Sequence, residues 1–299
     1  MKNIKHIVLS GGGFAGVIEY GIIKHLMTNK QIDMDSITSI YGTSIGSWLA
    51  VCFSLNYDMQ TLDDYIIKRP WDKIVTVSHE NIFDIFSNKG IFNEELIKKS
   101  FKPLFEAKNI DINITMKEFY ETTNKKLYFY STNLNSFSIK ELSYEETPNL
   151  PVYKAVTMSC AIPILFAPVQ YENNIFLDGG FMNNYPLQNC VERNPDEVDN
   201  IIGIRFSHNF IEHNTHDISL KTDFITYLLA LIRSILSKLS NDNKEVYKIK
   251  NEIMIPIDKE ELNVKNFSAL LSSIEEKQKL INIGIEYCRV FLNYNDECQ

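Results

Sequence analysis

The sequence predicts an α/β fold in which helices cover both faces of a mainly parallel central sheet. Two observations at the start of the chain support this prediction. A short buried strand over residues 6–10 leads through glycines into a helical pattern that ends near Asn29, and an isoleucine-rich strand over 36–43 leads into an apolar helix over 45–55. Strands and helices that alternate within so few residues are typical of parallel strands joined by crossover helices.

The rest of the chain continues this alternation around a more polar insertion. Residues 62–124 read as helical, and Thr115 with Glu118 forms a capping box that begins one of these helices. The pattern predicts further strands at 127–132, 174–177, 200–206 and 252–257, and helices at 151–160, about 220–239 and about 275–292. Nothing resembles a linker, so we expect one domain over residues 1–299, with core motifs within 4–186, an insertion at about 60–124, and C-terminal helices and a strand within 207–299.

The composition excludes some partners. The chain has 299 residues, 44% of them hydrophobic, which is ample for a large buried core. Its net charge is −8, so it gains no long-range attraction to nucleic acid phosphates or to an anionic membrane. We therefore expect no nucleic acid partner, and any contact with a membrane surface should be local and apolar.

Cysteine usage and the absence of a targeting segment indicate a location. The five cysteines are scattered without paired spacing, which predicts reduced thiols and no metal site: Cys52, Cys160, Cys190, Cys288 and Cys298. The N-terminus has no secretory signal, and the apolar run over 224–232 is far shorter than the roughly 20 residues of a spanning helix. The expectation is a cytoplasmic protein; peripheral membrane association and non-classical export remain alternatives.

A glycine loop directly follows the first strand. Gly11, Gly12, Gly13 and Gly16 let the backbone turn sharply and leave amide N–H groups unshielded at the start of a helix. Such a loop can bind a phosphate or stabilise a developing oxyanion. The spacing also matches the G-x-G-x-x-G pattern of dinucleotide-binding enzymes, but these carry an acidic residue at the end of the second strand.

The second strand ends instead in a serine between two glycines. Gly42, Ser44 and Gly46 have the G-x-S-x-G form of a nucleophile elbow, placed as required between a strand and a helix. The turn is so tight that side chains two positions before or after the serine would collide. This arrangement pushes the Ser44 hydroxyl out at the carboxyl end of the sheet, and makes Ser44 the candidate nucleophile.

The base that would activate Ser44 has two candidates. Asp178, followed by Gly179 and Gly180, ends a strand, although alone such a triplet usually forms only a turn. Together with His208, Ser44 and Asp178 would reproduce the Ser, Asp, His order of α/β-hydrolases. Only 33 positions separate Gly11 from Ser44, whereas an α/β-hydrolase places its elbow after several more strands. This spacing favours Asp178 without a histidine.

The three clusters together resemble the patatin-like phospholipase family. The segment from Ser159 to Val169 and the residues Asn184 and Pro186 add to the resemblance, which runs from about Ile4 to Pro186 and more loosely to the closing helix. It implies a three-layer α/β/α sandwich and a Ser44–Asp178 dyad, with an oxyanion hole formed by the amides of Gly11, Gly12 and Gly13 and no cofactor or metal.

The implied activity is hydrolysis of fatty acyl esters in phospholipids, galactolipids or neutral lipids. One position departs from the family, which usually has Arg or Lys where this chain has Ala15, and this leaves the headgroup preference open. Lipase, acyltransferase and catalytically inactive lipid-binding proteins on the same fold are alternatives.

Two apolar segments are candidates for lipid contact. Ile162, Ile164, Leu165 and Phe166 lie close in sequence to Asp178 and could line an acyl channel or pack in the core. The helix near 220–239 has one apolar face at helical spacing: Phe224, Leu228, Leu229, Ile232, Ile235, Leu236 and Leu239. Core packing is the usual role of such a face and docking at a lipid interface is the alternative, which Lys221, Arg233 and Lys238 keep open.

Overall fold

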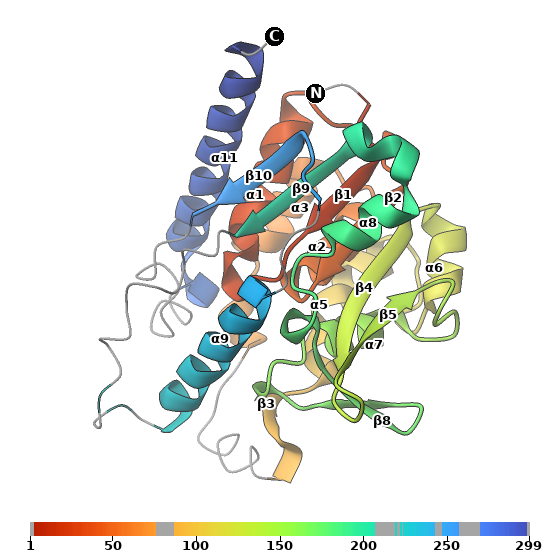
Figure 1. The fold of residues 1–299 in the computed structure, drawn as a ribbon, viewed down its shortest axis with the longest axis vertical. Helices are drawn as coiled ribbons and strands as arrows, with labels where there is room; N and C mark the ends of the chain where they lie inside the picture. The colour runs from red at the N-terminus through yellow and green to blue at the C-terminus, as the bar shows by residue number, and fades with distance from the viewer. Residues whose placement is uncertain are drawn as a thin grey trace.

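The computed structural model describes residues 3–75, 87–206, 219, 222, 224–242, 247–256 and 270–297. An eight-stranded sheet lies at its centre, in the order β10-β9-β1-β2-β4-β8-β7, with β5 paired to β4 (Figure 1). The strands are β1 (His6–Leu9), β2 (Ser39–Thr43), β4 (Lys126–Asn133), β5 (Ser138–Ser143), β7 (Val169–Tyr171), β8 (Asn174–Asp178), β9 (Ile201–Phe206) and β10 (Asn251–Ile255). Strands β10, β9, β1, β2 and β4 are parallel, which confirms the mainly parallel sheet.

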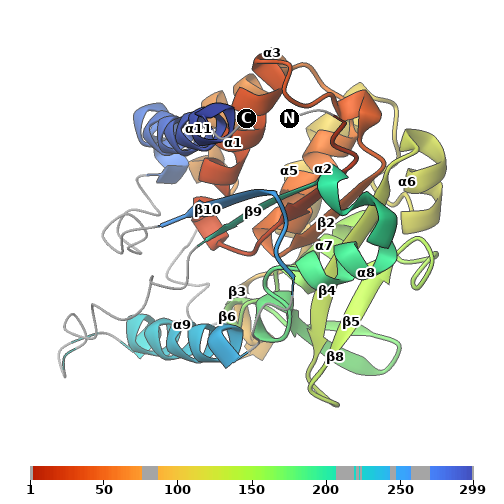
Figure 2. The same cartoon turned by 45° about the horizontal axis from the view of Figure 1, so that its top comes forward.

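Helices cover both faces of this sheet, as the sequence predicts. One face is covered by α8 (Leu187–Arg193), which packs on Val8, Tyr41 and Tyr128. The opposite face carries α1 (Gly16–Thr28), α2 (Ile45–Ser54) and α7 (Val152–Ser159), with α11 (Ile274–Glu297) against α1. Figure 2 shows the sheet between these layers. The result is the three-layer α/β/α arrangement.

Strand β4 places strands β2 and β8 end to end along one of its edges. Strand β5 pairs antiparallel with residues 128–133 of β4 and so occupies one of its edges. The other edge is shared: β2 runs parallel to residues 126–130, and β8 runs antiparallel to residues 131–133. Thr43 therefore lies opposite Tyr130 while Asp178 lies opposite Ser131, and β2 and β8 meet at their carboxyl ends.

The insertion packs onto the helix that follows Ser44. It contains α3 (Met59–Asp63), a π-helical turn η3 (Asp64–Lys68), a 3-10 turn η4 (Trp71–Lys73), β3 (Gly90–Phe92), α5 (Glu94–Ala107) and α6 (Met116–Thr123). Trp48 of α2 stacks on Tyr65 and Phe101, and its indole N–H donates to the Ser100 hydroxyl. The predicted capping box is confirmed, since Thr115 and Glu118 bond reciprocally. The insertion is thereby anchored beside the second helix.

The sequence located the long helices and most strands of the sheet, but it missed β5 and the shortest strands. Helix α9 (Phe224–Asp242) begins and ends later than predicted, and α11 extends beyond both predicted ends. The strand predicted over 36–43 begins only at Ser39, because Met34–Ser36 form a 3-10 turn (η2). Strands β3, β6 (Ile164–Phe166) and β7 have three residues each, too few for a hydrophobic period to be recognised. The described residues include no helix that is long and apolar enough to cross a membrane.

Candidate active site

Ser44 sits on a strained turn between β2 and α2. Its φ is 54° and its ψ is −123°, a conformation that costs a residue with a Cβ atom free energy and is kept only where the surroundings impose it. A Cβ atom on Gly42 would lie 2.6 Å from the backbone of Gly46, and one on Gly46 would lie 2.7 Å from the Leu9 carbonyl oxygen. Gly42 is thus required by the tight turn, as the sequence predicts, whereas Gly46 is required by the close approach of α2 to the end of β1.

Two serine side chains, those of Ser159 and Ser47, hydrogen-bond to the backbone of this turn. The Ser44 amide donates to the Ser159 hydroxyl (2.9 Å), which in turn donates to the Tyr130 carbonyl (2.7 Å). The Ser47 hydroxyl donates to the Ser44 carbonyl (2.6 Å). Sequence reasoning did not assign a role to Ser159; its place at the end of an apolar helix, just before the Ala-Ile-Pro segment, was the available signal. These bonds fix the backbone of Ser44 without engaging its hydroxyl.

The meeting of β2 and β8 brings Asp178 beside Ser44. The Asp178 amide donates to the Ala161 carbonyl (2.9 Å), and its carboxylate Oδ1 accepts from the Gly180 amide (2.7 Å). A Cβ atom on Gly179 would lie 2.2 Å from the Tyr130 carbonyl oxygen, so the chain must be glycine where it leaves β8. Ser44 and Asp178 are 134 positions apart in sequence, and they come together because β2 and β8 pair with the same edge of β4.

Burial makes the Asp178 carboxyl an unusually good base. The residue is 2% exposed, and its Oδ2 has no hydrogen-bond partner among the described residues. Burial raises the pKa of Asp178 to about 6, although hydrogen bonding with the Ser44 hydroxyl and the Gly180 amide lowers it. A carboxylate with a higher pKa has more affinity for a proton, so Asp178 is a stronger base than a solvated aspartate.

The glycine loop lies against Ser44 and is pinned by Asn184. The Gly11 amide donates to the Asn184 carbonyl (2.9 Å), and the Asn184 side chain donates to the Gly11 carbonyl (3.1 Å). A Cβ atom on Gly11 would lie 3.3 Å from the Ser44 Cβ. The Gly11 N–H, one of the three expected in the oxyanion hole, is therefore already engaged. Gly12 and Gly13 begin the short 3-10 turn η1 (Gly13–Ala15), whose first amides have no acceptor within the turn.

The remaining motif glycines allow close packing around the loop. Gly13 has a φ of 55°. A Cβ atom on Gly16 would lie 2.3 Å from the Ile45 side chain, and one on Gly180 would lie 2.9 Å from the Asn184 side-chain oxygen. The three sequence clusters thus converge at one place, at the carboxyl ends of β1, β2 and β8.

A buried acid beneath the loop was missed by the sequence analysis. Glu19 of α1 is fully buried; its Oε1 accepts from the Ser10 amide (3.1 Å) and the Ser10 hydroxyl (3.0 Å), and its Oε2 has no partner among the described residues. Burial raises the pKa of Glu19 well above its ordinary value, even though the bonds from Ser10 lower it. Ser10 immediately precedes Gly11, so this carboxyl sets where the glycine loop leaves β1.

We expect Glu19→Leu to reduce turnover and stability, while Glu19→Gln changes both little. Glutamine keeps an oxygen acceptor for Ser10, whereas leucine leaves the buried Ser10 hydroxyl without one, at a cost of about 1–3 kcal/mol. Thermal denaturation and ester hydrolysis of the two variants provide the measurement. Equal activity in Glu19→Leu and the wild type would show that the Ser10 contact does not position the loop.

The described histidines lie away from Ser44. His6 is at the amino end of β1, where its ring bonds to Ser39 (2.7 Å) and Glu197 (2.7 Å). His25 is in the last turn of α1 and contacts Asn29. The alternative base His208 lies outside the described residues. Among those residues, no group of His, Cys, Asp or Glu side chains could hold a metal ion.

The expected acyl-channel residues are partly buried, and Phe166 packs against the hydrophobic core. Ile162, Ile164, Leu165 and Phe166 are all half-buried, and β6 pairs with β3 so that Phe166 lies 5.7 Å from Phe92 between ring centres. Half-burial leaves apolar surface available beside the site. Ala15, where a basic residue was expected from the resemblance, is fully buried.

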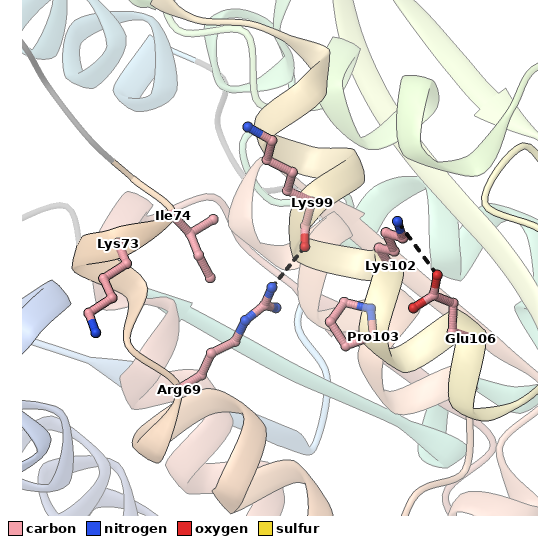
Figure 3. A pocket seen from close by; sticks show the side chains of 7 residues that line it. All are labelled: Arg69, Lys73, Ile74, Lys99, Lys102, Pro103 and Glu106. Carbon is pink, nitrogen blue, oxygen red and sulfur yellow. Dashed lines mark hydrogen bonds and ion pairs between the residues drawn. The ribbon is translucent and has the colours of Figure 1, made fainter.

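A pocket elsewhere on the molecule does not contain the site. A cavity of about 290 Å³ lies between η4 and α5 and is lined by Arg69, Lys73, Ile74, Lys99, Lys102, Pro103 and Glu106 (Figure 3). Arg69 donates to the Lys99 and Ser100 carbonyls, and Lys102 faces Glu106 (3.7 Å). Its lining includes none of the three clusters around Ser44, which is itself only 5% exposed.

Fold and site together define a class: α/β proteins that carry a serine on a G-x-S-x-G elbow beside a buried aspartate. The chain belongs to the patatin-like phospholipase family, whose model matches residues 7–191. It is thus a member of a lipid hydrolase family, as the sequence motifs indicate.

Individual proteins share this similarity. A probable lipid hydrolase of Invertebrate iridescent virus 6 is 29% identical over 257 residues, which cover 81% of this chain and 87% of that protein. A lysophospholipase of Kluyveromyces lactis is 25% identical over 202 residues, covering 62% of this chain and 12% of that protein. The crystal structure of VipD from Legionella pneumophila matches with a TM-score of 0.54 at 16% identity, over 98% of this chain and 67% of that chain, and supports the fold.

Proposed function

We propose that this protein is a phospholipase A-type lipid acyl hydrolase that acts through a Ser44–Asp178 dyad and an acyl-enzyme intermediate. The observation that supports this most is the burial of the Asp178 carboxyl directly beside a serine held on a strained elbow. A strained backbone and an unpaired buried oxygen both cost stability, and such features concentrate at functional sites.

In the proposed reaction, the Ser44 hydroxyl attacks the carbonyl carbon of a fatty acyl ester while Asp178 accepts its proton. The negative charge that develops on the carbonyl oxygen is stabilised by the amides of Gly12 and Gly13, and the loss of one such donor typically costs about 3–4 kcal/mol. Asp178 then gives the proton to the departing alcohol, which leaves the acyl group on Ser44. A water molecule, deprotonated by Asp178, releases the fatty acid and restores the serine.

The expected substrate class is an apolar acyl ester. The half-buried side chains of Ile162, Leu165 and Phe166 offer apolar surface on the segment after Ala161, whose carbonyl accepts from the Asp178 amide. The buried Ala15 supplies no charge for a headgroup. Hydrolysis or acyl transfer on neutral lipids uses the same machinery and is the second candidate. The name of the viral relative, a probable lipid hydrolase, agrees with either.

The rival functions find less support. A dinucleotide-binding oxidoreductase needs an acidic side chain at the end of the second strand, where β2 is followed by Ser44. A Ser–Asp–His triad needs a histidine beside Asp178, and the histidines within the described residues, His6 and His25, bond elsewhere. The triad is best tested through His208→Ala.

Covalent labelling tests the proposed function. A fluorophosphonate probe reacts with activated serines, so we expect a single adduct on the peptide that contains Ser44, and none in Ser44→Ala. Tandem mass spectrometry locates the adduct. Lipid hydrolysis by a protein that is labelled on another serine, or on none, would refute the assignment of Ser44.

A further inference from the structure

Exposed large apolar side chains gather on two elements of the molecule. Ten such side chains occur within the described residues, and seven of them lie on α9 and on the hairpin that joins β4 to β5. On α9 they are Phe224, Tyr227, Leu231 and Ile235, and on the hairpin they are Leu134, Phe137 and Ile139. The α9 residues are three or four positions apart and therefore share one side of the helix. The expectation that the apolar face of this helix packs in the core is therefore wrong for Phe224 and Ile235, whose side chains are exposed.

Both elements lie at the end of the sheet that carries Ser44. Strand β4 runs parallel to β2, and its residue Ser131 is opposite Asp178, so the hairpin continues past the site. At roughly 3.3 Å per residue, Leu134 lies about 10 Å beyond that level. Helix α9 packs on η5 (Gly179–Phe181), the turn that directly follows Asp178. In Figures 1 and 2 alike, α9 and the β4–β5 hairpin lie at this end of the molecule.

The charges of the two elements differ in sign from the charge of the chain. Helix α9 contains Arg233 and Lys238 against one acidic residue, Asp242, and the hairpin from Leu134 to Lys140 contains one lysine and no acidic residue. The whole chain carries 38 acidic against 30 basic residues. Apolar side chains interspersed with cations are the composition that inserts into the headgroup region of an anionic lipid surface.

We propose that these seven side chains form a docking face through which the protein binds an anionic lipid bilayer. The proposal deepens the proposed function and rests on it, because it names the surface from which the acyl-ester substrate enters. Ser44 is 5% and Asp178 2% exposed, so a lipid reaches them only by leaving its aggregate and entering the protein. A docking face at this end of the sheet shortens the path of the apolar acyl group through water, and exposure of that group to water is the unfavourable step.

Vesicle binding tests the docking face independently of catalysis. The Ser44→Ala protein is sedimented with phosphatidylcholine vesicles that contain or lack phosphatidylserine, so that no substrate is consumed. We expect binding to the anionic vesicles and a decrease with added salt. Adding Phe224→Ser and Leu231→Ser, or Leu134→Ser and Phe137→Ser, should reduce the partition coefficient by about tenfold or more. Val290→Ser on α11 is the matched control, since Val290 is 60% and Phe224 64% exposed.

Hydrolysis distinguishes docking from damage to the site. In the protein with Ser44 intact, the α9 pair should lower hydrolysis of vesicle lipid by the same factor as binding, while hydrolysis of a short soluble ester stays unchanged. An equal loss on both substrates would overturn the proposal, because α9 would then support the site itself. Vesicle binding that is unchanged in both double variants, or absent in the parent protein, would also overturn it. If Ser44 proved not to be the nucleophile, the vesicle-binding results would still stand, because binding is measured without catalysis.

Discussion

Ser44→Ala is expected to lower ester hydrolysis by at least about 10⁴-fold while leaving the folded structure intact. Removing a serine nucleophile from a hydrolase removes the covalent route altogether, and the residual rate comes from substrate binding and the oxyanion hole. The substitution deletes one hydroxyl and retains the Cβ atom. The hydrogen bond from the residue 44 amide to the Ser159 hydroxyl and the φ of 54° therefore remain, and the free energy of unfolding should be almost unchanged.

Two further substitutions distinguish the loss of chemistry from damage to the helix. Ser54→Ala removes a buried hydroxyl at the end of α2, which donates to the Ala50 carbonyl (2.7 Å), and should retain activity. Ser44→Gly should be as inactive as Ser44→Ala but more stable, by about 1 kcal/mol, because glycine adopts a positive φ without steric cost. Calorimetry and initial rates on a soluble ester check both. Activity in Ser44→Ala within tenfold of the wild type would eliminate Ser44 as the nucleophile.

The fold and the family could be read from the sequence because their signals are local. Gly42 and Gly46 flank Ser44 in one short segment, and the pattern of β1, β2 and their helices repeats within about 50 residues. The buried strands are apolar on both faces, which only a covered parallel sheet accommodates. The structure confirms this arrangement.

The contacts that complete the site could not be read in this way because they depend on the register of distant strands. Nothing in the sequence near Asp178 indicates that β8 meets β2 on one edge of β4. The same holds for Asn184, which occupies the Gly11 amide and so leaves Gly12 and Gly13 as the candidate oxyanion donors. Glu19 was overlooked because a single glutamate in an apolar helix resembles an ordinary surface residue until its burial is known. The roles of Ser44 and Asp178 stay predictions that the variants test.

Asp178→Asn should abolish most activity and, at neutral pH, stabilise the protein. Asparagine is nearly isosteric and its oxygen can still accept from the Gly180 amide, but it cannot take a proton from Ser44. We expect kcat to fall by about 10³-fold or more, since general-base catalysis typically supplies a factor of about 10²–10⁴. A loss larger than this range is expected only if deacylation is also lost. His208→Ala should retain turnover. If His208→Ala is inactive and folded while Asp178→Asn is active, the protein uses a different base.

The pH dependence follows from the pKa of about 6, against 3.8 for an ordinary aspartate. Activity of the wild type should fall as the pH drops through about 6, because Asp178 becomes protonated and can no longer accept the serine proton. Stability has the opposite dependence: the native state binds the proton more tightly than the unfolded chain, so the wild type loses stability as the pH rises from about 4 to about 6. At roughly 1.4 kcal/mol per unit, the ionised carboxyl costs up to about 3 kcal/mol at pH 7.

Asp178→Asn never carries that charge, so the stabilities of the two proteins should converge near pH 4 and separate above pH 6, with the variant more stable. Thermal denaturation across this range measures the difference. A wild type that is the more stable protein at pH 7 would mean that Asp178 is held ionised by favourable contacts, and would contradict a site in which burial prepares a base. A higher melting temperature together with lost turnover would instead show that the protein gives up stability to keep a carboxylate buried beside Ser44.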